Sequence, residues 1–231
     1  MNAILLDIEG TTTPIDFVHK VLFPYAKERV GKYVEMHFGK LSDEIAKLAD
    51  ESAHDNTYTV PVDTTEPGSV SAYLEHLISV DRKSTPLKSI QGSIWKEGYE
   101  SGELKSIVYD DVPPAFERWT ADGKTIAIYS SGSVLAQKLL FGYTDHGDLT
   151  PFVSANFDTN IGHKREAESY RTIAKELNLS AEDILFLSDI PEELAAASEA
   201  GFQTRLVVRP GNAEHHAAER FTSVTSFEGL D

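Results

Sequence analysis

Residues 3–14 read Ala-Ile-Leu-Leu-Asp-Ile-Glu-Gly-Thr-Thr-Thr-Pro, and this stretch is the key to the fold. The apolar run 4–6 has the length and composition of a short strand that is buried on both faces. Asp7 and Glu9 follow it, and Gly10 then permits a tight backbone path. In an extended segment, residues two apart point the same way, so both carboxyl groups can face one spot beyond the strand.

Two carboxylates so close together repel each other unless a cation lies there or one of them keeps its proton. A hard cation such as Mg²⁺ prefers oxygen ligands of this kind. The same pattern also has an ordinary explanation, in which Asp7 only caps a turn and Glu9 is solvated. The residues at the ends of the other strands decide between the two interpretations.

The composition excludes several classes of function. The chain has 231 residues, 41% of them hydrophobic, and a formal net charge of −16 with no run of Lys or Arg. Nucleic-acid binding needs a basic stripe, so no nucleic-acid partner is expected. The chain has no cysteine, which excludes disulfides and thiolate metal sites. No membrane span or basic, apolar leader is visible, so we expect a cytoplasmic protein that binds no membrane, in the form of a monomer.

Residues 16–104 contain helical patterns and no convincing strand. One amphipathic helix is predicted by apolar residues at helical spacing, namely Val70, Tyr73, Leu74, Leu77 and Ile78. Thr85 is the expected N-cap of the next helix, with Pro86 at its first position. That helix should end near Gly98 or Gly102.

From residue 105 onward, strands alternate with helices. Strands are predicted at residues 124–129, 152–156, 184–187 and 204–208, in addition to the first one. Such alternation predicts a doubly wound parallel sheet with helices on both faces. We therefore divide the chain into an α/β core domain, residues 1–15 and 105–231, and an inserted all-helical cap domain, residues 16–104. The last ten residues carry no pattern that we interpret.

Ligands of such sheets bind beyond the carboxyl ends of the strands. The residues that follow the predicted strands are Asp7 and Glu9, Ser130 and Ser131, Lys164, and Asp189 with Glu193. Each has an ordinary explanation: residues 130–133 and Asp189 can cap the helices that follow them, and Lys164 can be a solvated lysine. Together they make up the set that phosphoryl transfer requires, since it needs a nucleophile, acids and a cation.

The chemistry assigns each residue a task. Asp7 attacks phosphorus and forms an aspartyl-phosphate, with Mg²⁺ held between Asp7, Asp189 and the phosphate to offset the charge repulsion. Lys164 and the hydroxyl and amide donors of residues 130–131 neutralise the negative charge on the phosphoryl oxygens. Glu9 protonates the leaving oxygen and later deprotonates the attacking water.

These residues resemble the phosphatase branch of the haloacid dehalogenase superfamily. The Asp-x-acid-Gly-Thr opening, a strand ending in Ser, a later Lys and a strand ending in Asp occur in that order. The superfamily usually has Asp two residues after the nucleophile, and this sequence has Glu9 instead.

With Glu at this position, the sequence resembles a narrower family, the enolase-phosphatases (acireductone synthases) of methionine salvage. The likeness runs from residue 3 to about residue 210 and rests on several further motifs. They are residues 7–12, Gln91-Gly92, Ile94-Trp95, Gly98-Tyr99, Gly102, Tyr109 with residues 111–114, residues 128–134 with 136–138, and Gly162 with Lys164, Glu166, Ser169 and Tyr170. The Trp-Gly-Tyr-Gly part lies in the insertion, where relatives in the superfamily differ most.

The resemblance implies an enzyme with one Mg²⁺ per chain that acts on 5-methylthio-2,3-dioxopentyl 1-phosphate. It would enolise the diketone and then remove phosphate to release the acireductone. The family roles that the resemblance implies are Asp7 as nucleophile and metal ligand, Glu9 as acid/base whose main chain reaches the metal, Asp189 as a further metal ligand, and Ser130, Ser131 and Lys164 as holders of the substrate phosphate. The base for enolisation stays open between Glu9, Tyr99 and His19.

Two alternatives remain. The first is another cap-bearing phosphatase of the superfamily, which acts on a small sugar or metabolite phosphate. The second is a phospho-acceptor signalling domain, which also uses an Asp, Mg²⁺, a hydroxyl and a Lys. In such a domain the paired acids lie on the first strand and the phospho-acceptor on a later one, whereas here Asp7 and Glu9 come together.

Overall fold

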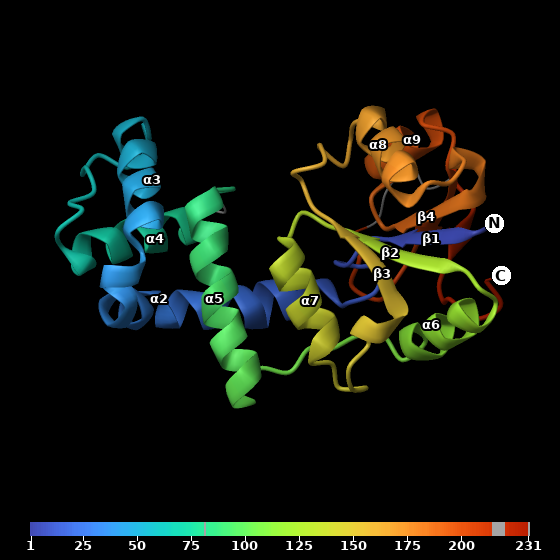
Figure 1. The fold of residues 1–231 in the computed structure, drawn as a ribbon, viewed down its shortest axis with the longest axis horizontal. Coiled ribbons are helices and arrows are strands. Elements are labelled where there is room, and N and C mark those ends of the chain that lie inside the picture. The colour runs from blue at the N-terminus through green and yellow to red at the C-terminus, as the bar shows by residue number, and fades with distance from the viewer. Residues whose placement is uncertain (81, 214–219, 231) are drawn as a thin grey trace. The chain divides into compact units, whose positions relative to one another are not determined.

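The computed structural model describes residues 1–80, 82–213 and 220–230. It separates into two compact units, Met1–Val18 with Lys105–Asp231, and His19–Leu104. The first unit is an α/β core, and the described part of the second contains helices and connecting turns (Figure 1). The predicted fold class, a doubly wound parallel sheet with an inserted helical segment, is confirmed.

The described part of the core contains one sheet of six parallel strands in the order β3-β2-β1-β4-β5-β6. The strands are β1 (Ala3–Leu6), β2 (Thr125–Tyr129), β3 (Val153–Phe157), β4 (Ile184–Ser188), β5 (Gln203–Val207) and β6 (Ser223–Val224). In the register of the sheet, Leu6 pairs with Ile128 on one side and with Leu187 on the other. Asp7 therefore leaves the sheet at the same level as the ends of β2 and β4.

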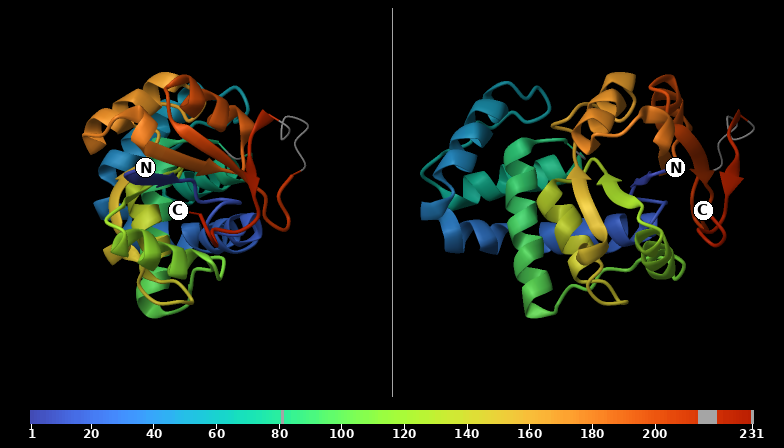
Figure 2. Two further views of the ribbon diagram at one scale, coloured as in Figure 1. Left: turned by 90° about the vertical axis from the view of Figure 1, so that its right-hand side faces the viewer. Right: turned by 45° about the vertical axis from the view of Figure 1, so that its right-hand side comes forward.

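Helices cover both faces of this sheet (Figures 1 and 2). Among the described residues, these helices are α6 (Val112–Ala121), α7 (Val134–Gly142), α8 (Ala167–Leu177) and α9 (Pro191–Glu199). Alternate residues of β1 belong to different cores: Ile4 and Leu6 pack in the core of α6 and α7, and Ala3 and Leu5 in that of α8 and α9. Since β1 is buried on both faces, its sequence reads as a continuous apolar run.

The second unit is built from α2 (Phe23–His37), α3 (Ser42–Ala53), α4 (Pro67–Ser79) and α5 (Thr85–Ser101). A short α1 (Ile15–Phe17) and a π-helical segment (Val18–Leu22) precede α2. Trp95 fastens α5 to the start of α2, because its Nε1 donates to Leu22 O at 2.9 Å and its ring stacks on Phe23. No helix among the described residues is both long and apolar enough to cross a membrane.

Two details differ from the sequence predictions. The N-cap of α5 is Ser84 and not Thr85: Ser84 has extended backbone angles, and its side chain accepts a bond from Leu87 N. The last ten residues contain structure after all, since β6 pairs with β5 and Phe227 is fully buried in the core of α6 and α7. A two-residue edge strand is too short to leave a periodic pattern in the sequence.

Candidate active site at the carboxyl end of the sheet

Lys164 lies between two acidic side chains in the core unit. Its Nζ is 2.6 Å from Asp7 Oδ1 and 2.6 Å from Glu193 Oε2. Ser188 Oγ lies 3.0 Å from the same Glu193 oxygen and 3.3 Å from Asp7 Oδ2. All four side chains are buried. Segments that are far apart in the sequence thus meet around Asp7, as expected for the carboxyl ends of parallel strands.

This cluster contains more acidic than basic side chains. Burial opposes the charge on Lys164, but the attraction of Asp7 and Glu193 outweighs it and raises the pKa of Lys164 above its ordinary value. Burial also raises the pKa of Asp189 to about 7, and repulsion from Asp7 and Glu193 adds to the effect. The pKa of Glu193 rises for the same reasons, burial first and then Asp7. Three buried carboxyl groups therefore face one ammonium group.

This excess of acid bears on whether the site suits Mg²⁺. The described residues contain no group of three or more His, Cys, Asp or Glu side chains placed to hold a metal ion. Mg²⁺ does not need such a group, because it keeps several waters and uses one or two carboxylates together with a substrate phosphate. Asp7 and Asp189 provide two carboxylates in a region short of positive charge. The donor set therefore fits Mg²⁺, with Asp7 and Asp189 as the residues that would hold it.

Glu9 lies in a tight turn directly after Asp7. Gly10 takes φ +68° in this turn, and a Cβ added to it would lie within 2.4 Å of Asp189 Oδ2. Only glycine therefore allows the turn to approach the Asp189 carboxylate so closely. Glu9 is half-buried, whereas Asp7 is buried.

Ser130 and Ser131 follow β2 and so lie at the same edge of the sheet. Ser130 is buried, and its Oγ accepts a hydrogen bond from Gly132 N at 3.2 Å. The N-cap of α7 is Ser133, whose side chain accepts from Ala136 N. The capping role that the sequence left open thus belongs to Ser133.

The alternative role of Asp189 as a helix cap is wrong. The N-cap position of α9 is Ile190, and no side chain caps the helix there. Instead Ser188 Oγ accepts from Ile190 N at 3.1 Å. Sequence reasoning gave Ser188 no role and named Glu193 only as a nearby acid. The available signal for Glu193 was its place four residues after Asp189, in the first turn of α9.

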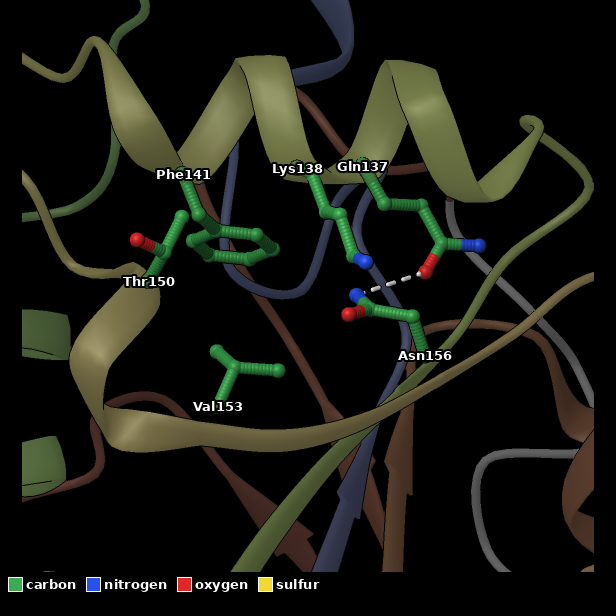
Figure 3. A pocket seen from close by; sticks show the side chains of 6 residues that line it. All are labelled: Gln137, Lys138, Phe141, Thr150, Val153 and Asn156. Carbon is green, nitrogen blue, oxygen red and sulfur yellow. Dashed lines mark hydrogen bonds between the residues drawn. The ribbon is translucent and has the colours of Figure 1, made fainter.

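A pocket of about 320 Å³ lies between α7 and β3 (Figure 3). It is lined by Gln137, Lys138, Phe141, Thr150, Val153 and Asn156. Gln137 Oε1 accepts from Asn156 at 3.0 Å, and its Nε2 donates to Gly132 O at 3.0 Å and Phe157 O at 2.8 Å. Gln137 therefore ties the loop after β2 to the end of β3.

Two candidates for the enolisation base belong to the helical unit. His19 is exposed. Its ring makes an edge-to-face contact with the ring of Phe23, with 5.5 Å between the two ring centroids. Tyr99 is buried in α5 together with Trp95. The bonding and burial of Trp95 show that it is a core residue of that unit.

The sequence and the fold of this chain are similar to those of known proteins. A family profile described as haloacid dehalogenase-like hydrolase matches residues 1–201. The chain is 50% identical to the enolase-phosphatase E1 of Synechococcus elongatus over 100% of its own length and 98% of the relative. It is 52% identical to the enolase-phosphatase E1 of Leptospira borgpetersenii over 96% of each chain. Among solved structures, the UTR4 protein of Saccharomyces cerevisiae superposes with a TM-score of 0.82 at 36% identity and 99% coverage of both chains.

Proposed function

Because this chain belongs to the enolase-phosphatase E1 family of haloacid dehalogenase-like hydrolases, we propose that it converts 5-methylthio-2,3-dioxopentyl 1-phosphate to the acireductone and phosphate. The enzyme is a phosphatase, and its pathway is methionine salvage. The observation that carries the proposal is about 50% identity to enolase-phosphatases over the whole chain, insertion included.

Asp7 is the proposed nucleophile. Its Oδ1 is engaged by Lys164 Nζ at 2.6 Å and by Ile8 N at 2.7 Å, which fixes the orientation of the carboxylate. Among the described residues, its Oδ2 has the longer contact with Ser188 Oγ at 3.3 Å, so this oxygen has lone pairs available for attack on phosphorus. The product of that attack is an aspartyl-phosphate on Asp7, which water then hydrolyses.

The other residues stabilise and relay charge. We assign Lys164, Ser130 and Ser131 to the phosphoryl oxygens, where their positive charge and donors oppose the developing negative charge. Glu9 serves as the acid that protonates the leaving oxygen and as the base for the attacking water. One Mg²⁺ per chain, held by Asp7, Asp189 and the main chain of Glu9, would lower the repulsion between nucleophile and phosphate.

The helical domain, residues 16–104, is proposed to determine which phosphate ester is accepted. The support is that the identity to enolase-phosphatases continues through this segment. We further propose that the enzyme acts as a cytoplasmic monomer, a point that sedimentation and cell fractionation test directly.

The test is to incubate the protein and Mg²⁺ with the diketone phosphate and, separately, with sugar phosphates. Phosphate release and the ultraviolet absorbance of the acireductone are followed together. The proposal expects both signals from the diketone phosphate and little phosphate from the sugars. Phosphate release without an enol signal would reject the enolase assignment and favour a phosphatase of other specificity.

A further inference from the structure

The turn formed by residues 8–13, here called the catalytic turn, carries Glu9 and adjoins Asp7 and Asp189. Its own main chain is tightly bonded: Gly10 N donates to Thr13 O at 2.8 Å, and the amides of residues 11–13 all point at Ile8 O. A Cβ built on Gly10 would collide with the Asp189 carboxylate, so the position of this turn limits where that carboxylate can lie.

Three consecutive carbonyl groups of the turn are held from outside by three different donors. Gly10 O accepts from Asn212 Nδ2 at 2.9 Å, and Thr11 O accepts from Arg209 Nε at 3.2 Å. Thr12 O accepts from Tyr109 N at 3.0 Å. The donors come from the segment after β5 and from the segment before α6. The position of the turn therefore depends on hydrogen bonds from residues that are distant in the sequence, in addition to its own main-chain bonds.

Arg209 is the centre of this arrangement. It is buried, and its Nη1 donates to Asp111 Oδ2 at 2.9 Å and to Thr225 O at 3.1 Å. Its guanidinium carbon lies 4.4 Å from the ring centroid of Tyr109 and 4.6 Å from that of Phe227. A planar fork with several donors can make these contacts simultaneously, which a lysine cannot.

Several buried polar atoms in and around the turn have no hydrogen-bond partner among the described residues. Within the described part of the chain, the buried atoms without a hydrogen bond include Thr11 Oγ1, Thr13 Oγ1, Tyr109 Oη, Arg209 Nη2 and Asn212 Oδ1. All five belong to the turn or to the residues that hold it. Buried polar groups normally find partners, and each exception calls for an explanation, of which a catalytic role is one.

We propose that Arg209 is a positioning residue of the phosphatase reaction, and that Asn212 assists it. It acts by holding the main chain of the catalytic turn, and so the acid/base Glu9, in register with Asp7 and Asp189. The inference rests on the proposed function. Because Lys164, Ser130 and Ser131 lie outside the turn, loss of Arg209 should, at saturating Mg²⁺, lower kcat and leave KM nearly unchanged.

The test compares two conservative variants, Arg209→Lys and Arg118→Lys. Arg118 is the matched control, because its Nη2 donates to Phe227 O at 2.7 Å and to Leu230 O at 3.4 Å in the same C-terminal segment. We expect Arg209→Lys to lower kcat about 10- to 100-fold with KM changed less than about twofold. Arg118→Lys should keep kcat within about twofold.

Amide hydrogen exchange of residues 10–13 provides a readout that needs no substrate. Exchange in the turn should rise about tenfold in Arg209→Lys and stay at the wild-type rate in Arg118→Lys. If Arg209→Lys does not fold, Asn212→Ala replaces it, since that change removes the side-chain bonds to Gly10 O and Val207 O.

The outcomes separate the two proposals. Wild-type protein that releases no phosphate from the diketone phosphate defeats the proposed function, while hydrogen exchange still tests the positioning of the turn. Arg209 loses its assigned role if kcat falls equally in both arginine variants, or if exchange in the turn is the same in Arg209→Lys and wild type.

Discussion

Replacing Lys164 by Met removes the ammonium group that separates two buried carboxylates. The Nζ atom is 2.6 Å from both Asp7 Oδ1 and Glu193 Oε2, and Asp189 adds a third buried acid nearby. Removing one partner of a buried ion pair costs about 3–5 kcal/mol, because the remaining charge stays uncompensated. We therefore expect the free energy of unfolding to fall by about 3–5 kcal/mol at pH 8 in metal-free protein.

The loss should depend on pH in a defined direction. Burial raises the pKa of Asp189 to about 7 and that of Glu193 above its ordinary value. Below pH 7 these acids bind protons in the folded state and need less positive charge beside them. A carboxyl group whose folded pKa is raised stabilises the fold only at low pH and loses that contribution as pH rises through the folded pKa. The penalty of Lys164→Met should thus shrink from pH 8 to pH 5.5.

Urea unfolding followed by circular dichroism, in EDTA, measures this free energy. Lys138→Met is the control, because Lys138 is exposed on α7, and it should change stability by less than about 0.5 kcal/mol. Added Mg²⁺ should recover part of the loss, since a bound cation stabilises the folded state. A Lys164→Met protein within about 1 kcal/mol of wild type at pH 8, or one with equal losses at both pH values, would refute the reasoning.

Other substitutions test the nucleophile, the turn and the helical unit. Asp7→Asn keeps the side-chain size, so phosphate release should fall at least about 1,000-fold with an unchanged circular dichroism spectrum; retained turnover would contradict the nucleophile role. Gly10→Ala places a Cβ within 2.4 Å of Asp189 Oδ2 at a residue with positive φ, so both the activity and the free energy of unfolding should fall. We expect a loss of roughly 1–2 kcal/mol in the free energy measured by urea unfolding. Gly98→Ala places a Cβ within 2.5 Å of Tyr25 Oη, and we expect a loss of about 1–3 kcal/mol; unchanged stability would mean that Tyr25 moves aside freely. Chelation of Mg²⁺ should stop phosphate release, and added Mg²⁺ should restore it. The affinity for Mg²⁺, measured by titration calorimetry, should fall about tenfold per pH unit below pH 7, because a proton competes with the metal for Asp189. An Mg²⁺ affinity that does not depend on pH would exclude Asp189 as a ligand.

The success of the sequence predictions differed from element to element. The strand at Ala3–Leu6 and the helix at Thr85–Ser101 were predictable because their apolar spacing is local. The cap of that helix was misplaced by one residue, because Ser84 and Thr85 are both good caps and only the backbone angles distinguish them. β6 was not predicted, because a strand of two residues is too short to show a hydrophobic periodicity.

The sequence alone determined that Asp7, Ser130, Lys164 and Asp189 would lie at one edge of a parallel sheet. The reason is that strand–helix alternation sends every strand in the same direction, so the residues after the strands share that edge. Tertiary structure alone decided that Lys164 bridges Asp7 and Glu193, and that Arg209 reaches the carbonyl of Thr11. Those contacts join residues that are far apart in the chain, and their distances depend on how helices and loops pack. No local pattern records such packing.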